Sequence, residues 1–179
     1  MTRTKKSDRL ACHVTLEVAM TSILLSLSLL GGLNDAEAAE LIVQVTAART
    51  FAVALGREPS TLPPWDTLGV GVLVPLSSGW AYYNEIGVAP GESELKPAFQ
   101  VVSGPTYRLS KLFVLGGSAL YKLSPTYDGG SPTHIAGVAL TPVIPNEWGS
   151  ISFPTGASYN ITAGVPVIAT NVKVAILLP

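Results

Sequence analysis

The chain has 179 residues, of which 13% are charged, against roughly 25% in an ordinary soluble domain. It is nevertheless 47% hydrophobic, with a mean hydropathy of +0.41, and it contains 17 glycines and 14 prolines. Disorder requires low hydrophobicity and high net charge, so this composition excludes a disordered chain. The 11 basic residues are balanced by 12 acidic ones, which excludes a basic nucleic-acid-binding protein. The length fits one domain.

The N-terminal residues have the three parts of a secretory signal peptide. A basic region at residues 3–9 precedes an uncharged apolar run at 18–30, and Ala36-Glu37-Ala38 follows as an A-x-A cleavage site. The apolar run is shorter than the ~20 residues that a membrane-spanning helix needs. We expect residues 1–38 to be a signal peptide and residues 39–179 to be the mature domain.

The mature chain lacks the residues of most metal and disulfide sites. Cys12 is the only cysteine and lies before the apolar run, so we expect no disulfide and no thiolate metal site after cleavage. His134 is the only histidine expected in the mature chain, and a lone histidine is a poor metal site. We therefore expect neither a metal nor another cofactor.

From residue 40 onward, apolar residues recur at every second position, which is the pattern of half-buried strands. In 67–76, for example, Leu68, Val70, Val72 and Val74 share one face, and the other face is mostly small. Six further segments show the same alternation: 80–89, 98–109, 112–123, 135–144, 148–159 and 172–178.

An eighth segment spans residues 41–55, where Arg49 falls on the otherwise apolar face. Three interpretations stay open: a bulge that resets the register, a strand limited to Thr50–Leu55, or a short helix at Leu41–Ala48.

Long and short connections alternate along these segments. The long ones are 56–66, 90–97 and 124–134, and the short ones are 77–79, 110–111 and 145–147. Outer-membrane β-barrels have short periplasmic turns, longer outside loops and strands of about 9–11 residues with apolar-out alternation. Over residues 39–179 the chain therefore resembles the small eight-stranded outer-membrane β-barrels of the OmpA/OmpX-like class. The fold that the resemblance implies is an all-β, antiparallel, up-and-down barrel of about eight strands. The chain departs from the usual pattern at its last residue, Pro179, where many such proteins end in an aromatic residue.

Aromatic residues cluster near the ends of the predicted strands, as in the girdles at the two membrane interfaces. The candidate interface aromatics are Trp80, Tyr82, Tyr107, Phe113, Tyr121 and Tyr159.

Charged residues within the clearly alternating strands all fall on the small, polar face, which becomes the lumen of a barrel. These residues are Glu85, Arg108, Lys122 and Lys173. A charge that faces lipid costs ~2–4 kcal/mol at mid-membrane, so a barrel requires this segregation. We expect a structural ion pair of Glu85 with Lys173 or with Arg108.

His134 is the one candidate for catalysis, as a base that Ser131 or Ser158 approaches near the outside rim. Its neighbours, Pro132-Thr133-His134-Ile135-Ala136, show no catalytic spacing, so the preferred interpretation is a loop-end residue without enzymatic activity.

Three functions remain in order of preference. The first is a monomeric outer-membrane barrel without a large pore, embedded in the lipid bilayer, with a structural, adhesive or surface-interaction role through its long loops. The second is a secreted or periplasmic soluble β-sandwich or barrel that binds a ligand or assembles with itself. The third is a lipid-modifying barrel enzyme centred on His134.

Overall fold

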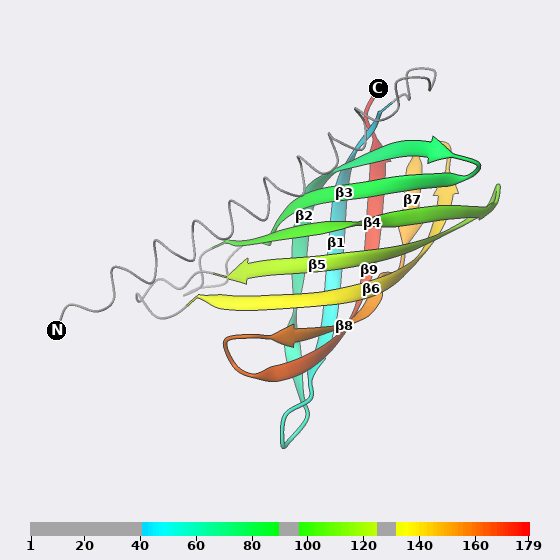
Figure 1. Cartoon of the computed structure of the whole chain (residues 1–179). Helices are drawn as coiled ribbons and strands as arrows, with labels where there is room; N and C mark the ends of the chain where they lie inside the picture. Colours follow the sequence, from blue (N-terminus) through cyan, green and yellow to red (C-terminus); the bar gives the residue numbers. More distant parts are fainter. Residues whose placement is uncertain (1–40, 90–96, 125–131) are drawn as a thin grey trace. The chain divides into compact units, whose positions relative to one another are not determined.

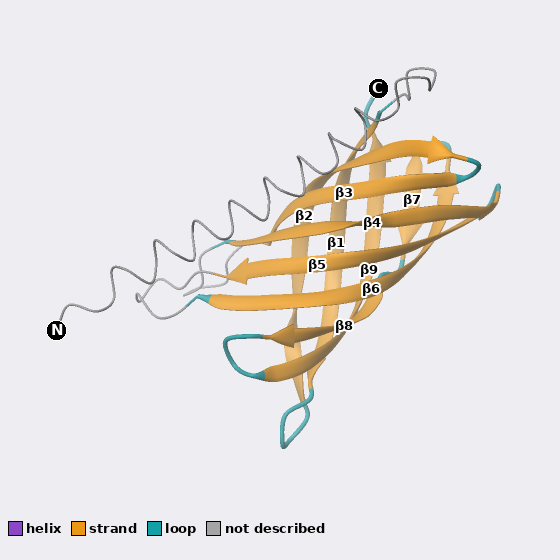
Figure 2. Cartoon of the chain, in the orientation of Figure 1, coloured by secondary structure: helices purple, strands orange, loops and turns teal. Residues whose placement is uncertain are grey.

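The computed structural model describes residues 41–89, 97–124 and 132–179, and these residues form antiparallel strands joined by turns (Figures 1 and 2). The predicted signal peptide lies outside the described residues. Within the described ranges, no helix is long and apolar enough to cross a membrane. The strands are β1 (Ile42–Ala54), β2 (Ser60–Ser77), β3 (Trp80–Ala89), β4 (Ala98–Ser110), β5 (Phe113–Ser124), β6 (Thr133–Asn146), β7 (Gly149–Ser152), β8 (Thr155–Asn160) and β9 (Val165–Leu177).

The segments β7 and β8 are two halves of one strand. Both pair with β6 on one side and with β9 on the other, and the register does not change across Phe153 and Pro154. Proline has no N–H to donate, so the ladder is interrupted there. The Phe153 N–H donates to the Pro142 carbonyl at 3.0 Å, and the Asn171 N–H donates to the Pro154 carbonyl at 2.8 Å. The nine segments therefore make eight strands.

The sheet closes on itself because β1 pairs with both β2 and β9. A path along paired residues leaves β1 at Ala54 and returns to β1 at Gln44, which is a displacement of 54 − 44 = 10 residues. Its steps are Ala54, Val167, Ser158, Gly137, Leu120, Val102, Glu85, Gly71 and Gln44. With strands ~4.8 Å apart and ~3.3 Å per residue, this stagger tilts the strands by roughly 40° from the barrel axis.

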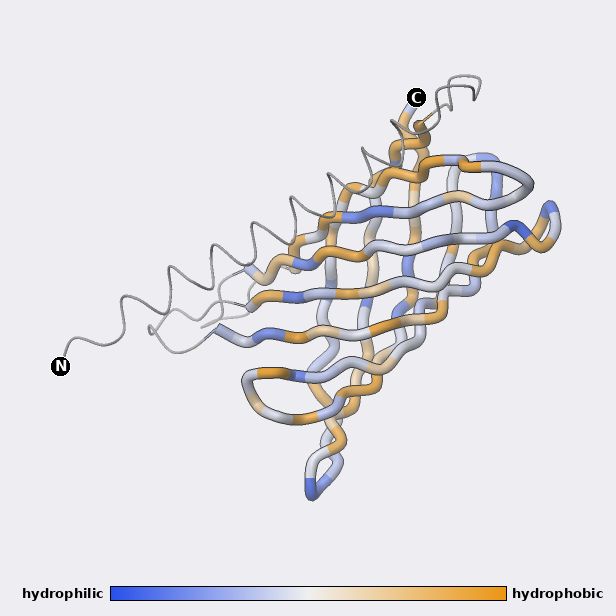
Figure 3. The backbone as a smooth tube through the Cα atoms, viewed as in Figure 1, coloured by the Kyte–Doolittle hydropathy of each residue, from blue (hydrophilic) through white to orange (hydrophobic). Residues whose placement is uncertain are grey.

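Successive side chains of a strand point to opposite faces of the sheet, and the hydropathy changes along the strands in Figure 3. The outward positions carry large apolar side chains that are exposed. They include Val45, Phe51, Leu68, Val70, Ile86, Val88, Phe99, Val138, Leu140, Ile144, Ile168, Val172 and Ile176. The fully buried positions hold mostly small residues, such as Ala52, Ala98 and Ala175. The barrel is thus more apolar outside than a soluble protein, whose core is its most apolar part.

The first hairpin differs from the sequence-based expectation. Residues 60–66 belong to β2, so the predicted loop at 56–66 shrinks to the few residues after Ala54. The strand β1 runs unbroken from Ile42 through Ala48 to Ala54, without a helix and without a reset of its register against β9. The bulge lies instead in β2, where three residue steps from Trp65 to Leu62 match two from Thr50 to Ala52. Pro63 and Pro64 occupy it, as expected for residues that cannot donate to a ladder.

Arg49 consequently stays on the outer face. It lies in register with Asp66 of β2, and the two side chains form an ion pair at 3.8 Å with 58% and 61% of their surfaces exposed. This position agrees with the sequence pattern of residues 41–55, in which Arg49 falls on the otherwise apolar face. An opposite charge directly across the strand pair offsets the placement.

Glycine is required where β4 and β5 approach each other most closely. A Cβ on Gly104 would lie 2.0 Å from the carbonyl oxygen of Gly117, whereas a Cβ on Gly117 would meet nothing within 4 Å. We expect Gly104→Ala to lower the free energy of unfolding by about 2 kcal/mol or more, because the backbone of β5 has to move. Urea unfolding of the purified barrel, followed by tryptophan fluorescence, measures this change. Gly117→Ala is the matched control, and equal midpoints for the two variants would contradict the close approach.

Candidate functional site in the barrel interior

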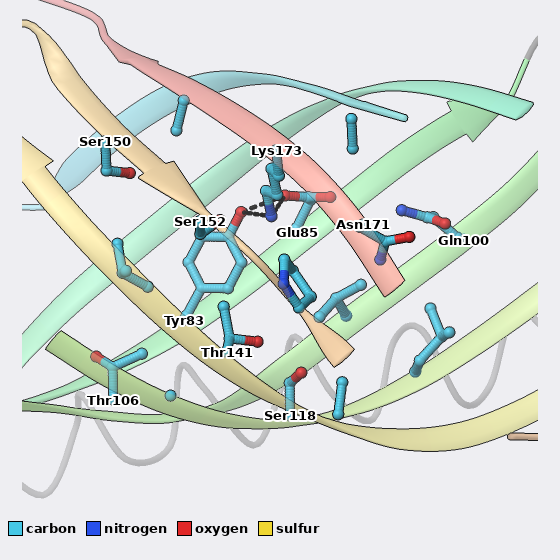
Figure 4. Close-up of a pocket in the computed structure, with 18 of the residues that line it drawn as sticks. Tyr83, Glu85, Gln100, Thr106, Ser118, Thr141, Ser150, Ser152, Asn171 and Lys173 are labelled. Atoms are coloured by element: carbon cyan, nitrogen blue, oxygen red, sulfur yellow. Dashed lines mark hydrogen bonds and ion pairs between the residues drawn. The ribbon is translucent and has the colours of Figure 1, made fainter. Parts of the chain in front are cut away.

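A cavity of about 320 Å³ occupies the interior and is lined by residues from every strand (Figure 4). Most of its lining positions alternate with the exposed apolar positions on the same strands, and exceptions such as Asn146 and Leu177 lie at strand ends. Glu85, Arg108, Lys122 and Lys173 all line it. Among the described residues, no group of three or more His, Cys, Asp or Glu side chains is placed to hold a metal ion.

Glu85 and Lys173 come together across the lumen. Glu85 projects from β3 and Lys173 from β9, with β2 and β1 between them in the sheet. Their ammonium and carboxylate groups form an ion pair, with 11% of the Lys173 side chain and 2% of the Glu85 side chain exposed. Arg108, the other predicted partner of Glu85, is exposed and lies opposite Val114, next to the β4–β5 turn. The geometry thus selects Lys173.

Tyr83 completes this cluster, and the sequence analysis did not single it out. Its hydroxyl donates to the Glu85 carboxylate and accepts a hydrogen bond from Lys173 Nζ at 2.8 Å. The Lys173 ammonium also lies 4.6 Å from the centroid of the Tyr83 ring. The Tyr83 ring fits because residue 71 is glycine: a Cβ at that position would lie 2.6 Å from the Tyr83 hydroxyl. Tyr83 shares the inner face with Glu85, and that parity is the only signal of its role in the sequence.

Lys122 is held differently. Its ammonium lies 4.0 Å from the centroid of the Trp65 ring, and its register neighbours are Gln100 on β4 and Ile135 on β6. Trp65 belongs to β2 and Lys122 to β5, so this cation–π contact also crosses the lumen. Sequence reasoning missed Trp65 because it assigned residues 56–66 to a loop.

The six candidate interface aromatics fall into two groups along the strands. Trp80, Tyr107 and Phe113 lie next to the turns that join β2 to β3 and β4 to β5, and the Trp80 and Tyr107 rings pack with centroids 4.8 Å apart. Tyr82 lies two residues further from the β2–β3 turn than Trp80, and its hydroxyl accepts a hydrogen bond from Ser103 at 3.1 Å. Tyr121 and Tyr159 lie near the C-terminal ends of β5 and β8, at the other end of the barrel from Trp80 and Tyr107. The Tyr159 residue is 49% exposed.

His134 does not form a catalytic pair with Ser158. Its Nδ1 is hydrogen-bonded to the Tyr121 hydroxyl at 2.7 Å. Ser158 lines the interior and points its hydroxyl at the Val167 carbonyl, whereas His134 has the outward parity of its strand, opposite to that of the lining residue Ile135. Ser131, the other predicted nucleophile, lies outside the described residues. The arrangement among these residues is that of a packed strand end.

The strand pairing and the interior cluster define a closed, eight-stranded, up-and-down β-barrel with a buried ion pair in its lumen. Neither a protein-family model nor a curated protein matches the chain.

Solved structures with a similar chain path include Ail, the attachment invasion locus protein of Yersinia pestis. It has 13% identity and a TM-score of 0.48, over 78% of this chain and 99% of that chain. Neisserial surface protein A (NspA) has 13% identity and a TM-score of 0.49, over 79% of this chain and 100% of that chain. A second Ail structure, in complex with the heparin analogue sucrose octasulfate, has 12% identity and a TM-score of 0.42, over 78% of this chain and 99% of that chain. The architecture rests on the strand pairing and not on these likenesses.

Removal of one partner of the interior ion pair leaves an uncompensated buried charge. We expect Lys173→Met and Glu85→Gln each to lower the free energy of unfolding by about 3–5 kcal/mol, and the double variant to recover much of this loss. Urea unfolding of the refolded barrel measures all three. Lys111→Gln, in the exposed β4–β5 turn, is the matched control and should change stability by less than about 0.5 kcal/mol. Additive losses in the double variant would contradict the pairing.

Proposed function

We propose that the mature chain is a monomeric bacterial outer-membrane β-barrel, exported by the N-terminal signal peptide. The observation that carries the proposal is the ring of large apolar side chains exposed on the outer face of the strands. In water, such a contiguous apolar surface favours aggregation, whereas in a bilayer it meets hydrocarbon. The buried ion pair of Glu85 and Lys173 also fits a membrane barrel, because it keeps both charges in the interior and away from lipid.

The role that fits this barrel is structural, adhesive or surface-interacting. An eight-stranded barrel has an interior just wide enough for its own side chains or one small ligand, so it does not serve as a general diffusion pore. Contact with other molecules then falls to the connections at the loop end: the β1–β2 turn, residues 90–97, residues 124–134 and the β8–β9 turn. Most of the connections 90–97 and 124–134 lie outside the described residues.

The main alternative is a soluble module. A β-sandwich has two sheets with open edges, and the pairing of β1 with β9 contradicts this. A soluble closed barrel differs from a membrane barrel only in what its outer face contacts, and the exposed apolar ring favours lipid. Substitutions on the outer face therefore distinguish the two.

We expect the expressed chain to fractionate with the outer membrane and to migrate faster on a gel before heating than after. Leu140→Arg places a charge at the middle of β6, where 57% of Leu140 is exposed. In a bilayer, it should lower barrel stability by about 2–4 kcal/mol and reduce the heat-modifiable fraction. Leu112→Arg, in the β4–β5 turn where 75% of the residue is exposed, is the matched control. Soluble recovery, or equal tolerance of both arginines, would overturn the proposal.

The orientation of the barrel can be tested with single cysteines, since Cys12 belongs to the predicted signal peptide. Ala163 lies in the exposed β8–β9 turn, and Lys111 lies in a turn at the other end of the barrel. We expect a membrane-impermeant maleimide to label Ala163→Cys on intact cells, and Lys111→Cys only after the outer membrane is permeabilised. Labelling of Lys111→Cys alone on intact cells would show that the barrel has the opposite orientation, and labelling of both variants would contradict membrane insertion.

A further inference from the structure

The interior holds two buried polar atoms without hydrogen-bond partners among the residues described. They are Thr67 Oγ1 on β2 and Asn171 Oδ1 on β9. Thr67 is only 3% exposed, and Asn171 lines the cavity. An unsatisfied buried polar group is unfavourable, so a native structure rarely leaves one without a partner.

Two more polar side chains reach the same part of the lumen. Thr67 and Gln100 both cover Gly87, where a Cβ would lie 2.9 Å from Thr67 Cγ2 and 3.1 Å from Gln100 Cγ. Lys122 is the register neighbour of Gln100. Figure 4 shows the amide groups of Gln100 and Asn171 in the pocket.

These four side chains lie on one side of the Glu85–Lys173 pair. Glu85 is in one register row with Gly71 on β2, Val102 on β4 and Leu120 on β5. On the same three strands, Thr67, Gln100 and Lys122 lie nearer to the long-connection end of the barrel than this row. Asn171 likewise precedes Lys173 on β9. We call this part of the cavity the outer lumen.

The remaining wall of the outer lumen is aliphatic. It includes Leu120, Ile135, Val167 and Ala169. The whole interior cavity, of which the outer lumen is one part, measures about 320 Å³, at the lower end of the range of about 300–1,000 Å³ that is usual for small-molecule sites. An apolar wall with a few convergent polar groups is also their usual composition.

We propose that the outer lumen binds a small amphipathic hydroxycarboxylate, a molecule with a carboxylate, a hydroxyl group and a medium-length alkyl chain. The carboxylate pairs with Lys122, whose ammonium otherwise contacts the face of Trp65. The ligand hydroxyl donates to Asn171 Oδ1, an acceptor that needs a donor. The alkyl chain lies against the aliphatic wall, where burial of its CH₂ groups removes apolar surface from water. This site depends on the lumen geometry and not on the membrane in which the barrel resides.

Trp65 serves as the reporter of binding. Trp80 and Trp148 are half exposed on the protein surface, so Trp80→Phe with Trp148→Phe leaves Trp65 as the single tryptophan. Titration of this refolded variant in lipid nanodiscs with 3-hydroxydecanoate should give a saturable change in emission. Decanoate, which lacks the hydroxyl, should bind at least fivefold more weakly, and decanol, which lacks the carboxylate, at least tenfold more weakly.

Three substitutions, made in this background and checked for folding by the heat-modifiable shift, test the contacts. Lys122→Gln should weaken binding of 3-hydroxydecanoate at least tenfold in calorimetric titration, while Lys111→Gln should leave it unchanged. Asn171→Leu should remove the preference for 3-hydroxydecanoate over decanoate. A variant with Trp80 alone, made with Trp65→Phe and Trp148→Phe, reports partition of the probe into the lipid.

The following results would overturn the proposal. A change in emission that does not saturate, or that is equal for Trp65 and Trp80, shows partition into the bilayer only. Equal affinity in Lys122→Gln, or a hydroxyl preference that survives Asn171→Leu, places the ligand elsewhere.

Discussion

Closure of the sheet is the constraint on which the rest of the barrel depends. A strand edge exposes unpaired N–H and C=O groups, and hydrocarbon has no water to satisfy them. The ladder between β1 and β9 removes the last edge, from the Gln44–Leu177 pair to the Ala54–Val167 pair. Once the strand number and a stagger of ten residues are set, the barrel width and the depth of each interior residue follow.

The narrow interior explains the distribution of small residues. Opposite walls are near enough for Lys122 to reach Trp65 and for Lys173 to reach Glu85, so several inner positions next to these large side chains are small. Gly71 makes room for the Tyr83 ring, and Gly87 makes room for Thr67 and Gln100. Glycine weakens a strand locally because it loses more conformational freedom on folding. Here that loss is offset by side chains that cross the lumen.

The alternation of apolar and small residues was sufficient to predict the strands and their faces, because the period of two follows directly from strand geometry. It could not give the partners, since parity defines a face but not a register. Residues 56–66 were assigned to a long connection, which hid Trp65 and Asp66 in β2 and left Arg49 without its partner. Tyr83 was missed for a similar reason, because its role requires Gly71 opposite it and Lys173 at its hydroxyl.

The two parts of the lumen differ in how completely their polar groups are satisfied, and this difference separates structure from binding. Around Glu85, the carboxylate, the ammonium and the Tyr83 hydroxyl satisfy one another, so this cluster has little left to offer a ligand. Asn171 Oδ1 and Thr67 Oγ1 are buried without partners among the described residues, and Asn171 lies in a wall that is largely aliphatic. If only stability were selected, apolar residues of similar shape would be nearly neutral or favourable at these positions. A ligand hydroxyl that reaches Asn171 Oδ1 in the outer lumen would supply the donor that this acceptor needs.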